Sequence, residues 1–276
     1  MLNKIININS KNITLVVLSF FIAQISAYAG ANNASPPLIF GLLPSESAVT
    51  KFKRYAPLRD YLSTKLNRKV HLETARDFPE FLRRTKKGRY DFLETAPHFV
   101  IPAIDSKKYT VISTIIQPLS AQIVVLEKSK HKNLFSLAGL SIATPSPKAI
   151  ITKIGKATVK KALPESPAYK TYKTHNAAYE SVISHQTDAA IISVNVYNKA
   201  IDQNKPLKSI AESRAIPNMS ILVSAQIAPS LKNKLQSTLV NMRNTSKGKS
   251  VLKKISYPGY RKTNAAEFEA LRRYIK

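Results

Sequence analysis

The sequence predicts an α/β protein built from mainly parallel sheets with helices on both faces. Two observations support this prediction. Short apolar runs alternate with helical stretches along the chain, and several of the runs end in small polar residues just where a helix should begin. With 276 residues, of which 44% are hydrophobic, the chain can bury a sizeable core in one or two lobes.

In the first half, apolar or alternating runs predict strands at residues 38–43, 69–74, 90–93, 109–116 and 121–128. Helices are expected from the serines after Pro44 to about Leu66, with a kink or a new segment at Pro57, and also over 78–87 and 97–104. In the second half, strands are expected at 140–144, 169–174, 188–193, 207–213 and 219–227. Helices are expected there at 149–162, 176–184, 231–242 and 264–275.

The stretch "GRYDFLETAPHF", residues 88–99, suggests where a ligand would bind. Its expected strand stops at Glu94, and Pro97 occupies a position typical of a first helical turn. In parallel sheets, ligands bind beyond the carboxyl ends of strands, where helices begin. Free backbone N–H groups and the positive end of the helix dipole favour a small anionic ligand at such a place.

The first residues predict export. Lys4 and Lys11 give a positive start, Ile13–Ala23 is apolar but too short to span a bilayer comfortably, and Ala27–Ala29 supplies the small residues of a cleavage site. Residues 1–29 are therefore predicted to be a cleaved signal peptide, with an uncleaved membrane anchor as the alternative. The chain has no cysteine, which excludes disulfides, thiol chemistry and a lipidated cysteine. The predicted location is the bacterial periplasm, without a lipid anchor.

The strong positive charge is compatible with several kinds of binding partner. The formal net charge is +27, and removing Lys4 and Lys11 with the signal lowers it by two, to +25. The lysines are spread along the chain and do not alternate with aromatic residues, so a solvated basic surface is favoured over a nucleic-acid site. A polyanion-binding or envelope-binding protein remains an alternative.

Four stretches carry a family resemblance in order and spacing: "LIFGLLPSESAV", residues 56–103, "HNAAYESVISHQTDAAII" and "IPNMSILVSAQIAPSLKNKLQSTL". Together they resemble the phosphate/phosphonate-type solute-binding proteins of bacterial ABC transporters, from about Leu38 to Leu239. The resemblance implies a two-lobed Venus-flytrap, the type II periplasmic-binding-protein fold, with a two-strand hinge near 116–124 and 218–223. It implies one lobe from 30–119 and 216–276 and another from 120–215.

The resemblance also implies a function and a ligand site. The protein would be a monomer that captures a small polar anion for a membrane permease and its ATPase, without a cofactor. A periplasmic sensing partner of a membrane kinase is an alternative use of the same domain. The implied ligand residues follow strands in both lobes. They are Ser45, Ser47, Glu94, Thr95, His98, Thr144, Ser146, Lys148, His175, Asn176, Ser193 and Asn195.

One segment departs from the family pattern. After the strand at 140–144, phosphonate binders typically carry small hydroxyl residues and a glycine, whereas this chain has "TPSPKAI" with two prolines, no glycine and Lys148. Proline has no backbone N–H to donate, so part of an oxyanion cradle should be missing. Lys148 would then compensate as a point charge, or the ligand would differ.

Several of these residues have a second reading. The serines, threonines and asparagines are also ordinary helix caps. Glu94 repels an oxyanion and would suit a ligand with an amine. His98 could equally be a capping residue, whereas His175 is favoured as a ligand residue. Glu94 and the two histidines are zinc-ligand types, but no H-E-x-x-H spacing occurs.

Catalysis is disfavoured because no G-x-S-x-G, G-x-x-x-x-G-K-[ST] or G-x-G-x-x-G motif occurs in a chain with 7 glycines. A Ser–His–Asp set assembled in space, as in an esterase, stays open as an alternative.

Overall fold

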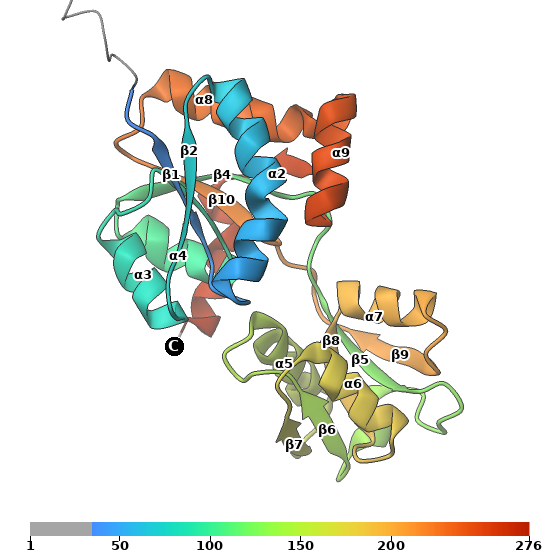
Figure 1. The fold of residues 1–276 in the computed structure, drawn as a ribbon. Coiled ribbons are helices and arrows are strands. Elements are labelled where there is room, and N and C mark those ends of the chain that lie inside the picture. Colours follow the sequence, from blue (N-terminus) through green and yellow to red (C-terminus); the bar gives the residue numbers. More distant parts are fainter. Residues whose placement is uncertain (1–34, 276) are drawn as a thin grey trace, which may run out of the picture. The chain divides into compact units, whose positions relative to one another are not determined.

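The computed structural model describes residues 35–275, which form two sheets (Figure 1). The first sheet has six strands in the order β11-β4-β10-β3-β1-β2, and the second has five in the order β7-β6-β8-β5-β9. The first contains β1 (Leu38–Leu42), β2 (Val70–Thr74), β3 (Phe92–Thr95), β4 (Tyr109–Ile115), β10 (Ser220–Ser224) and β11 (Tyr260–Lys262). The second contains β5 (Ala121–Leu126), β6 (Ser141–Thr144), β7 (Ala168–Thr171), β8 (Ala189–Ser193) and β9 (Leu207–Glu212).

Helices cover both faces of each sheet, as the apolar strand runs predict. One face of the first sheet packs against α2 (Ala48–Leu66), α8 (Pro229–Val240), the short 3₁₀ helix η2 (Asn241–Asn244) and α9 (Ser246–Ile255). Its other face packs against α3 (Phe78–Lys86), α4 (Pro97–Asp105) and the 3₁₀ helix η3 (Ala265–Tyr274). The second sheet lies between η1 (Leu134–Leu137) with α5 (Ile150–Ala162) and α6 (His175–Ile183) with α7 (Val194–Asp202).

The chain crosses between the sheets twice, once from β4 to β5 and once from β9 to β10 (Figure 1). The crossing segments pair with each other through Leu119 and Ile216, whose backbone N–H groups donate to each other's carbonyl oxygens at 2.9 and 2.8 Å. Leu119 lies within the predicted first hinge segment, 116–124. Ile216 lies two residues before the predicted second hinge segment, 218–223. The exact limits of the two lobes stay a prediction, and the predicted signal peptide lies outside the described residues.

The sheets are mixed rather than mainly parallel. The strands β1, β2 and β3 are parallel neighbours, as are β7, β6 and β8. In contrast, β10 runs antiparallel to β3 and β4, and β5 runs antiparallel to β8 and β9. The physical reason is the double crossing, because a strand that enters from the other sheet runs opposite to the strands beside it.

Some element boundaries also differ from those predicted. The strand β3 continues through Glu94 and Thr95, and α2 runs unbroken through Pro57. The helices α7 and α9 and the strand β11 were not predicted, and the last segment is a 3₁₀ helix. No helix within residues 35–275 has the length and apolar character needed to cross a membrane.

The helix α5 packs closely against the second sheet at Gly155. A Cβ atom there would lie 2.3 Å from the Ile191 Cγ2 atom and 3.3 Å from the Ala121 Cβ atom. We expect Gly155→Ala to lower the free energy of unfolding by about 1–2 kcal/mol, because overpacking outweighs the gain of about 1 kcal/mol in helix propensity. Urea denaturation measures this change. In the Ile191→Ala background the same substitution should cost less, and an equal cost would contradict the clash.

Candidate functional site

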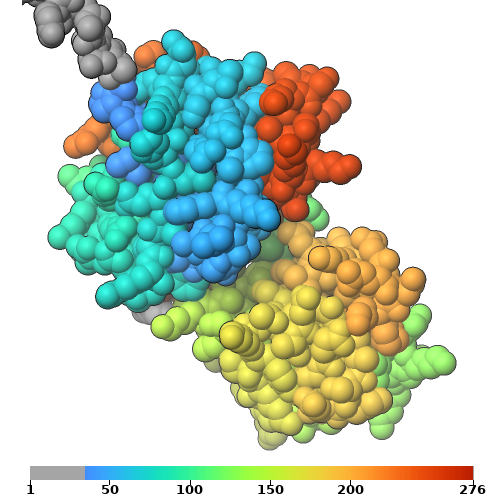
Figure 2. Space-filling model, viewed as in Figure 1, coloured from blue at the N-terminus to red at the C-terminus, as the bar shows by residue number. Residues whose placement is uncertain are grey.

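The carboxyl ends of β1 and β3 lie side by side because these strands are parallel neighbours. The backbone N–H of Leu43 donates to the Glu94 carbonyl oxygen at 3.2 Å and joins the two ends. Ser45 and Ser47 follow β1 and are exposed, and the start of α2 lies at the surface of the view in Figure 2. Ser47 caps α2 by accepting from the Thr50 N–H at 3.2 Å, so its expected capping role is observed.

Two buried side chains at the end of β3 have no hydrogen-bond partner. The Thr95 side chain is 1% exposed, and its Oγ1 atom contacts no donor or acceptor in the described part of the chain. Both ring nitrogens of His98 are also unpaired there, and burial lowers the pKa of His98 to about 4, with a smaller contribution from the charge of Lys153. Unsatisfied buried polar atoms are rare in native proteins and call for an explanation. A polar ligand at this point would provide these partners.

The helix α4 that follows β3 begins at Pro97 after Ala96, and no side chain caps its first turn. The imidazole of His98 lies 4.0 Å, centroid to centroid, from the ring of Phe99. The end of β3 therefore combines an uncapped helix start, a hydroxyl and a neutral imidazole. Such a set can donate hydrogen bonds to an oxygen atom of a ligand.

Glu94 faces inward, away from solvent, with an exposure of 1%. Its carboxylate accepts hydrogen bonds from three tyrosines: from Tyr55, from Tyr257 at 2.8 Å and from Tyr260 at 3.3 Å. Burial raises the pKa of Glu94 and raises the pKa of each of these tyrosines well above its usual value. The carboxylate thus has partners inside the sheet–helix core, and a direct ligand contact by Glu94 stays a prediction.

Lys51 completes this buried cluster. The side chain is 2% exposed, and its ammonium donates to Ser45 Oγ at 2.8 Å and pairs with Glu46 at 3.1 Å. Burial lowers the pKa of Lys51, while the charge of Glu94 raises it. The sequence analysis missed this lysine, although its spacing from Tyr55 and Leu58 places all three on the apolar stripe of α2.

The second sheet gathers its own set of strand ends. Thr144 ends β6, and its carbonyl oxygen accepts from the Tyr172 N–H at 2.8 Å. Ser193 ends β8 and caps α7, and its backbone N–H donates to the Nδ1 atom of His175 at 3.2 Å. Burial lowers the pKa of His175 to about 4. The Thr144 side chain is fully buried, and its Oγ1 atom has no partner among residues 35–275.

The "TPSPKAI" turn leaves the next helix start open. The helix α5 begins at Ile150, beyond both prolines, and no side chain caps it. Ser146 and Lys148 are exposed, and Ser146 Oγ accepts from the Lys148 backbone N–H at 3.3 Å. The prolines therefore do not remove the N–H groups of the first helical turn, which begin after them. Thr152 in that turn donates to the Ser146 carbonyl oxygen at 2.9 Å.

Asn176 and Asn195 are exposed in the first turns of α6 and α7. Asn195 also lines a cavity of about 370 Å³ together with Gln117, Asn218 and Tyr257. Gln117 and Asn218 belong to the crossing segments. Thr144, His175 and Ser193 do not line this cavity. Across the described residues, no three histidine, aspartate or glutamate side chains are grouped so that they could hold a metal ion.

The helix α5 of the second sheet is linked to the helices of the first sheet through Lys153. Lys153, one turn into α5, acts on the pKa of His98 and donates a hydrogen bond to the Tyr274 carbonyl oxygen in η3. The helix η3 packs against α4. The first turns of α5 are therefore near enough for the charge of Lys153 to act on His98.

Comparison with known proteins agrees with this arrangement. The family of periplasmic substrate-binding proteins of phosphonate ABC transporters matches residues 40–268. A binding-protein component of a Pseudomonas aeruginosa ABC phosphonate transporter is 16% identical, with a TM-score of 0.65 over 86% of this chain and 84% of that one.

Two further solved structures have the same fold. A Prochlorococcus marinus protein in complex with methylphosphonate is 14% identical, with a TM-score of 0.70 over 86% of this chain and 96% of that one. A Xanthomonas citri protein bound to ATP is 13% identical, with a TM-score of 0.71 over 87% and 97%. The predicted type II periplasmic-binding-protein fold is confirmed. The chain belongs to the family of periplasmic substrate-binding proteins of phosphonate ABC transporters, which bind solutes and are not enzymes.

Proposed function

We propose that this protein captures a small oxyanion, a phosphonate-like molecule or a small organic acid, for delivery to a membrane permease and its ATPase. The observation that carries the proposal is the pair of buried threonine hydroxyls, Thr95 and Thr144, that end β3 and β6 without a partner. Each is followed by a helix whose first turn has no side-chain cap. A hydroxyl beside an uncapped helix start is suited to a ligand oxygen that carries negative charge.

The local charges support an anion. His98 and His175 are neutral at pH 7 because their pKa values are near 4, so each ring can offer one N–H donor without adding charge. The negative charge of Glu94 is shared by three tyrosine hydroxyls and lies near the buried ammonium of Lys51. We assign Glu94 to positioning the end of β3, and the hydroxyls and imidazoles to contact with the ligand.

Export and lobe closure belong to the same proposal. Residues 1–29 act as the signal, and the segments 30–119 and 216–276 move against 120–215 about the bridge between Leu119 and Ile216. Closure would bring the two sets of strand ends onto the ligand and exclude water.

Isothermal titration tests the proposal against phosphate, phosphonates, phosphite, sulfate and small organic anions. We expect one of these to bind, and we expect Thr95→Val and Thr144→Val each to weaken that binding at least tenfold, about 1.4 kcal/mol. Valine keeps the shape and removes only the donor.

Thr85→Val is the matched control, because Thr85 is equally buried but donates to the Phe81 carbonyl oxygen within α3. This variant should bind as the wild type does. A folded protein that binds nothing in the panel would count against the proposal. Binding that survives both strand-end substitutions would place the site elsewhere.

A further inference from the structure

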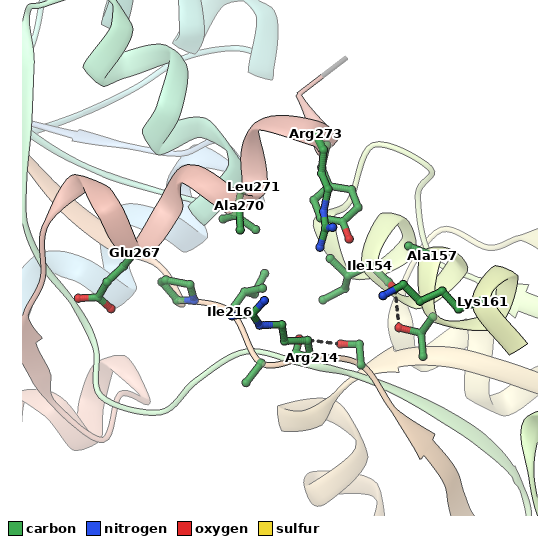
Figure 3. A pocket seen from close by; sticks show the side chains of 14 residues that line it. Ile154, Ala157, Lys161, Arg214, Ile216, Glu267, Ala270, Leu271 and Arg273 are labelled. Carbon is green, nitrogen blue, oxygen red and sulfur yellow. Dashed lines mark hydrogen bonds between the residues drawn. The ribbon is translucent and has the colours of Figure 1, made fainter.

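A second pocket lies between α5, the crossing segment 213–217 and η3 (Figure 3). Its volume is about 450 Å³, within the range of small-molecule sites. Its apolar wall includes Ile154 and Ala157 from α5, Ile216 from the crossing segment, and Ala270 and Leu271 from η3. None of the twelve predicted ligand residues lines it, so it is separate from the strand-end site.

Three cationic side chains surround this pocket. They are Lys161 at the end of α5, Arg214 in the crossing segment and Arg273 in η3. Figure 3 shows their charged ends directed toward the space between the three segments. None of the three forms an ion pair with an acidic side chain of residues 35–275, unlike most other arginines of the chain.

The acidic residue in the lining does not compensate these charges. Glu267 is held by Arg261 at 2.6 Å and accepts from the Thr263 hydroxyl at 2.7 Å. In Figure 3 the Glu267 side chain points away from the three cations. Like charges that converge on one space repel one another, and a bound anion would relieve this repulsion.

We propose that this pocket is a second ligand site, which takes an amphipathic anion with a carboxylate or phosphate head and a short alkyl chain. The head would lie among Lys161, Arg214 and Arg273, and the chain against the apolar wall. The two arginines can hold such a head through paired N–H donors. Burial of the alkyl chain favours binding because it removes apolar surface from water.

The position of this pocket ties it to the hinge. Ile216, which lines it, is the residue that pairs with Leu119 between the crossing segments. Tyr274 also lines it, packs at the edge of core clusters in both sheets and accepts a hydrogen bond from Lys153. A ligand in the pocket would therefore contact elements of both sheets, which the lobe closure proposed above would shift against each other.

Sodium octanoate is the probe, and isothermal titration of the full mature chain is the measurement. We expect saturable binding of one octanoate per chain. Octanamide, which lacks the charge, and inorganic phosphate, which lacks the chain, should each bind at least tenfold more weakly. The strand-end ligand is not used in this titration, so the result is independent of the proposed transport function.

Two kinds of variant test whether octanoate binds in this pocket: one removes its charges and the other fills its space. The triple variant Lys161→Gln/Arg214→Gln/Arg273→Gln should weaken octanoate binding at least tenfold, and Ala157→Phe should do the same by filling the space with all charges kept. The matched control is Lys132→Gln/Lys234→Gln/Lys249→Gln, which removes three exposed cations elsewhere and should bind as the wild type does. Equal weakening by both triple variants would show a general charge effect and overturn the proposal, as would unchanged binding in Ala157→Phe.

Discussion

Replacing Glu94 by leucine is expected to lower the free energy of unfolding by about 3–5 kcal/mol. The substitution removes the carboxylate that accepts from Tyr55, Tyr257 and Tyr260, and of these contacts it leaves the hydrogen bond between the Tyr55 and Tyr257 hydroxyls at 2.7 Å. It also removes the charge that does most to raise the pKa of Lys51, whose side chain is 2% exposed. Breaking one side of such a buried arrangement costs far more than the interaction itself contributes, because the remaining groups stay desolvated. Urea denaturation at pH 7 measures the change.

A double-mutant cycle separates the charge effect from the loss of packing. Lys51→Met removes the ammonium and keeps an unbranched chain of similar length. We expect Glu94→Leu to cost at least 1 kcal/mol less in the Lys51→Met background than in the wild type. Tyr260→Phe is a milder reference, expected to cost about 1 kcal/mol because it removes one hydrogen bond of 3.3 Å. Additive effects of Glu94→Leu and Lys51→Met would contradict electrostatic coupling between the two residues.

This cluster also shows the limit of sequence-based prediction. The position of Glu94 at a strand end could be inferred from the local pattern, since an apolar run is followed by a proline typical of a first helical turn. Its partners could not be inferred. Tyr257 and Tyr260 come from a segment more than 160 residues away, which joins the same sheet through the antiparallel pairing of β11 with β4.

The missed helices have a local explanation. The helix α9 contains Gly248, which lowers helix propensity, yet tertiary packing requires glycine there because a Cβ atom would lie 2.0 Å from the Met242 carbonyl oxygen. The helix α7 begins directly at Val194, next to the strand β8, with no residue between them. Because no turn residues separate the strand from the helix, the sequence does not show where the helix begins.

The sequence predicts which residues lie at the strand ends, but it does not predict whether their hydroxyls form hydrogen bonds. Parallel neighbours must present their carboxyl ends at one edge, so Thr95 and Thr144 could be selected from the sequence. Whether a hydroxyl caps a helix or stays unpaired depends on where that helix begins. Ser47 and Ser193 cap their helices, whereas Thr95 and Thr144 end strands ahead of helices that begin later, and they remain unpaired in the described structure.

Acidification should destabilise the protein through its buried histidines. The pKa of His98 is near 4 in the folded state, and an unfolded histidine titrates near 6.5. Its contribution to stability is therefore complete above pH 6.5 and is lost as the pH falls from 6.5 toward 4, because the unfolded chain binds the proton first. From pH 7.5 to 4.5 this loss is about 2–3 kcal/mol for His98, and His175 adds a similar loss.

His98→Leu should remove the His98 part of this dependence, because leucine has no proton to bind and no unpaired ring nitrogen to bury. Unfolding by urea at pH 7.5 and 4.5 should then differ by about 2–3 kcal/mol less than in the wild type. His71→Gln is the control, since His71 lies exposed on β2, and it should keep the wild-type difference. Equal pH dependence in His98→Leu and the wild type would contradict the burial of a neutral His98.

The same titration can report on the ligand. A bound anion beside the imidazole would favour its protonated form and raise the pKa of His98 above 4. Because the bound folded state then takes up the proton more readily, saturating ligand should reduce the acid loss in the wild type. In His98→Leu the reduction should be smaller than in the wild type, because only His175 then remains beside the anion. Stability that depends on acid equally with and without ligand would show that the anion binds away from His98, whatever its affinity.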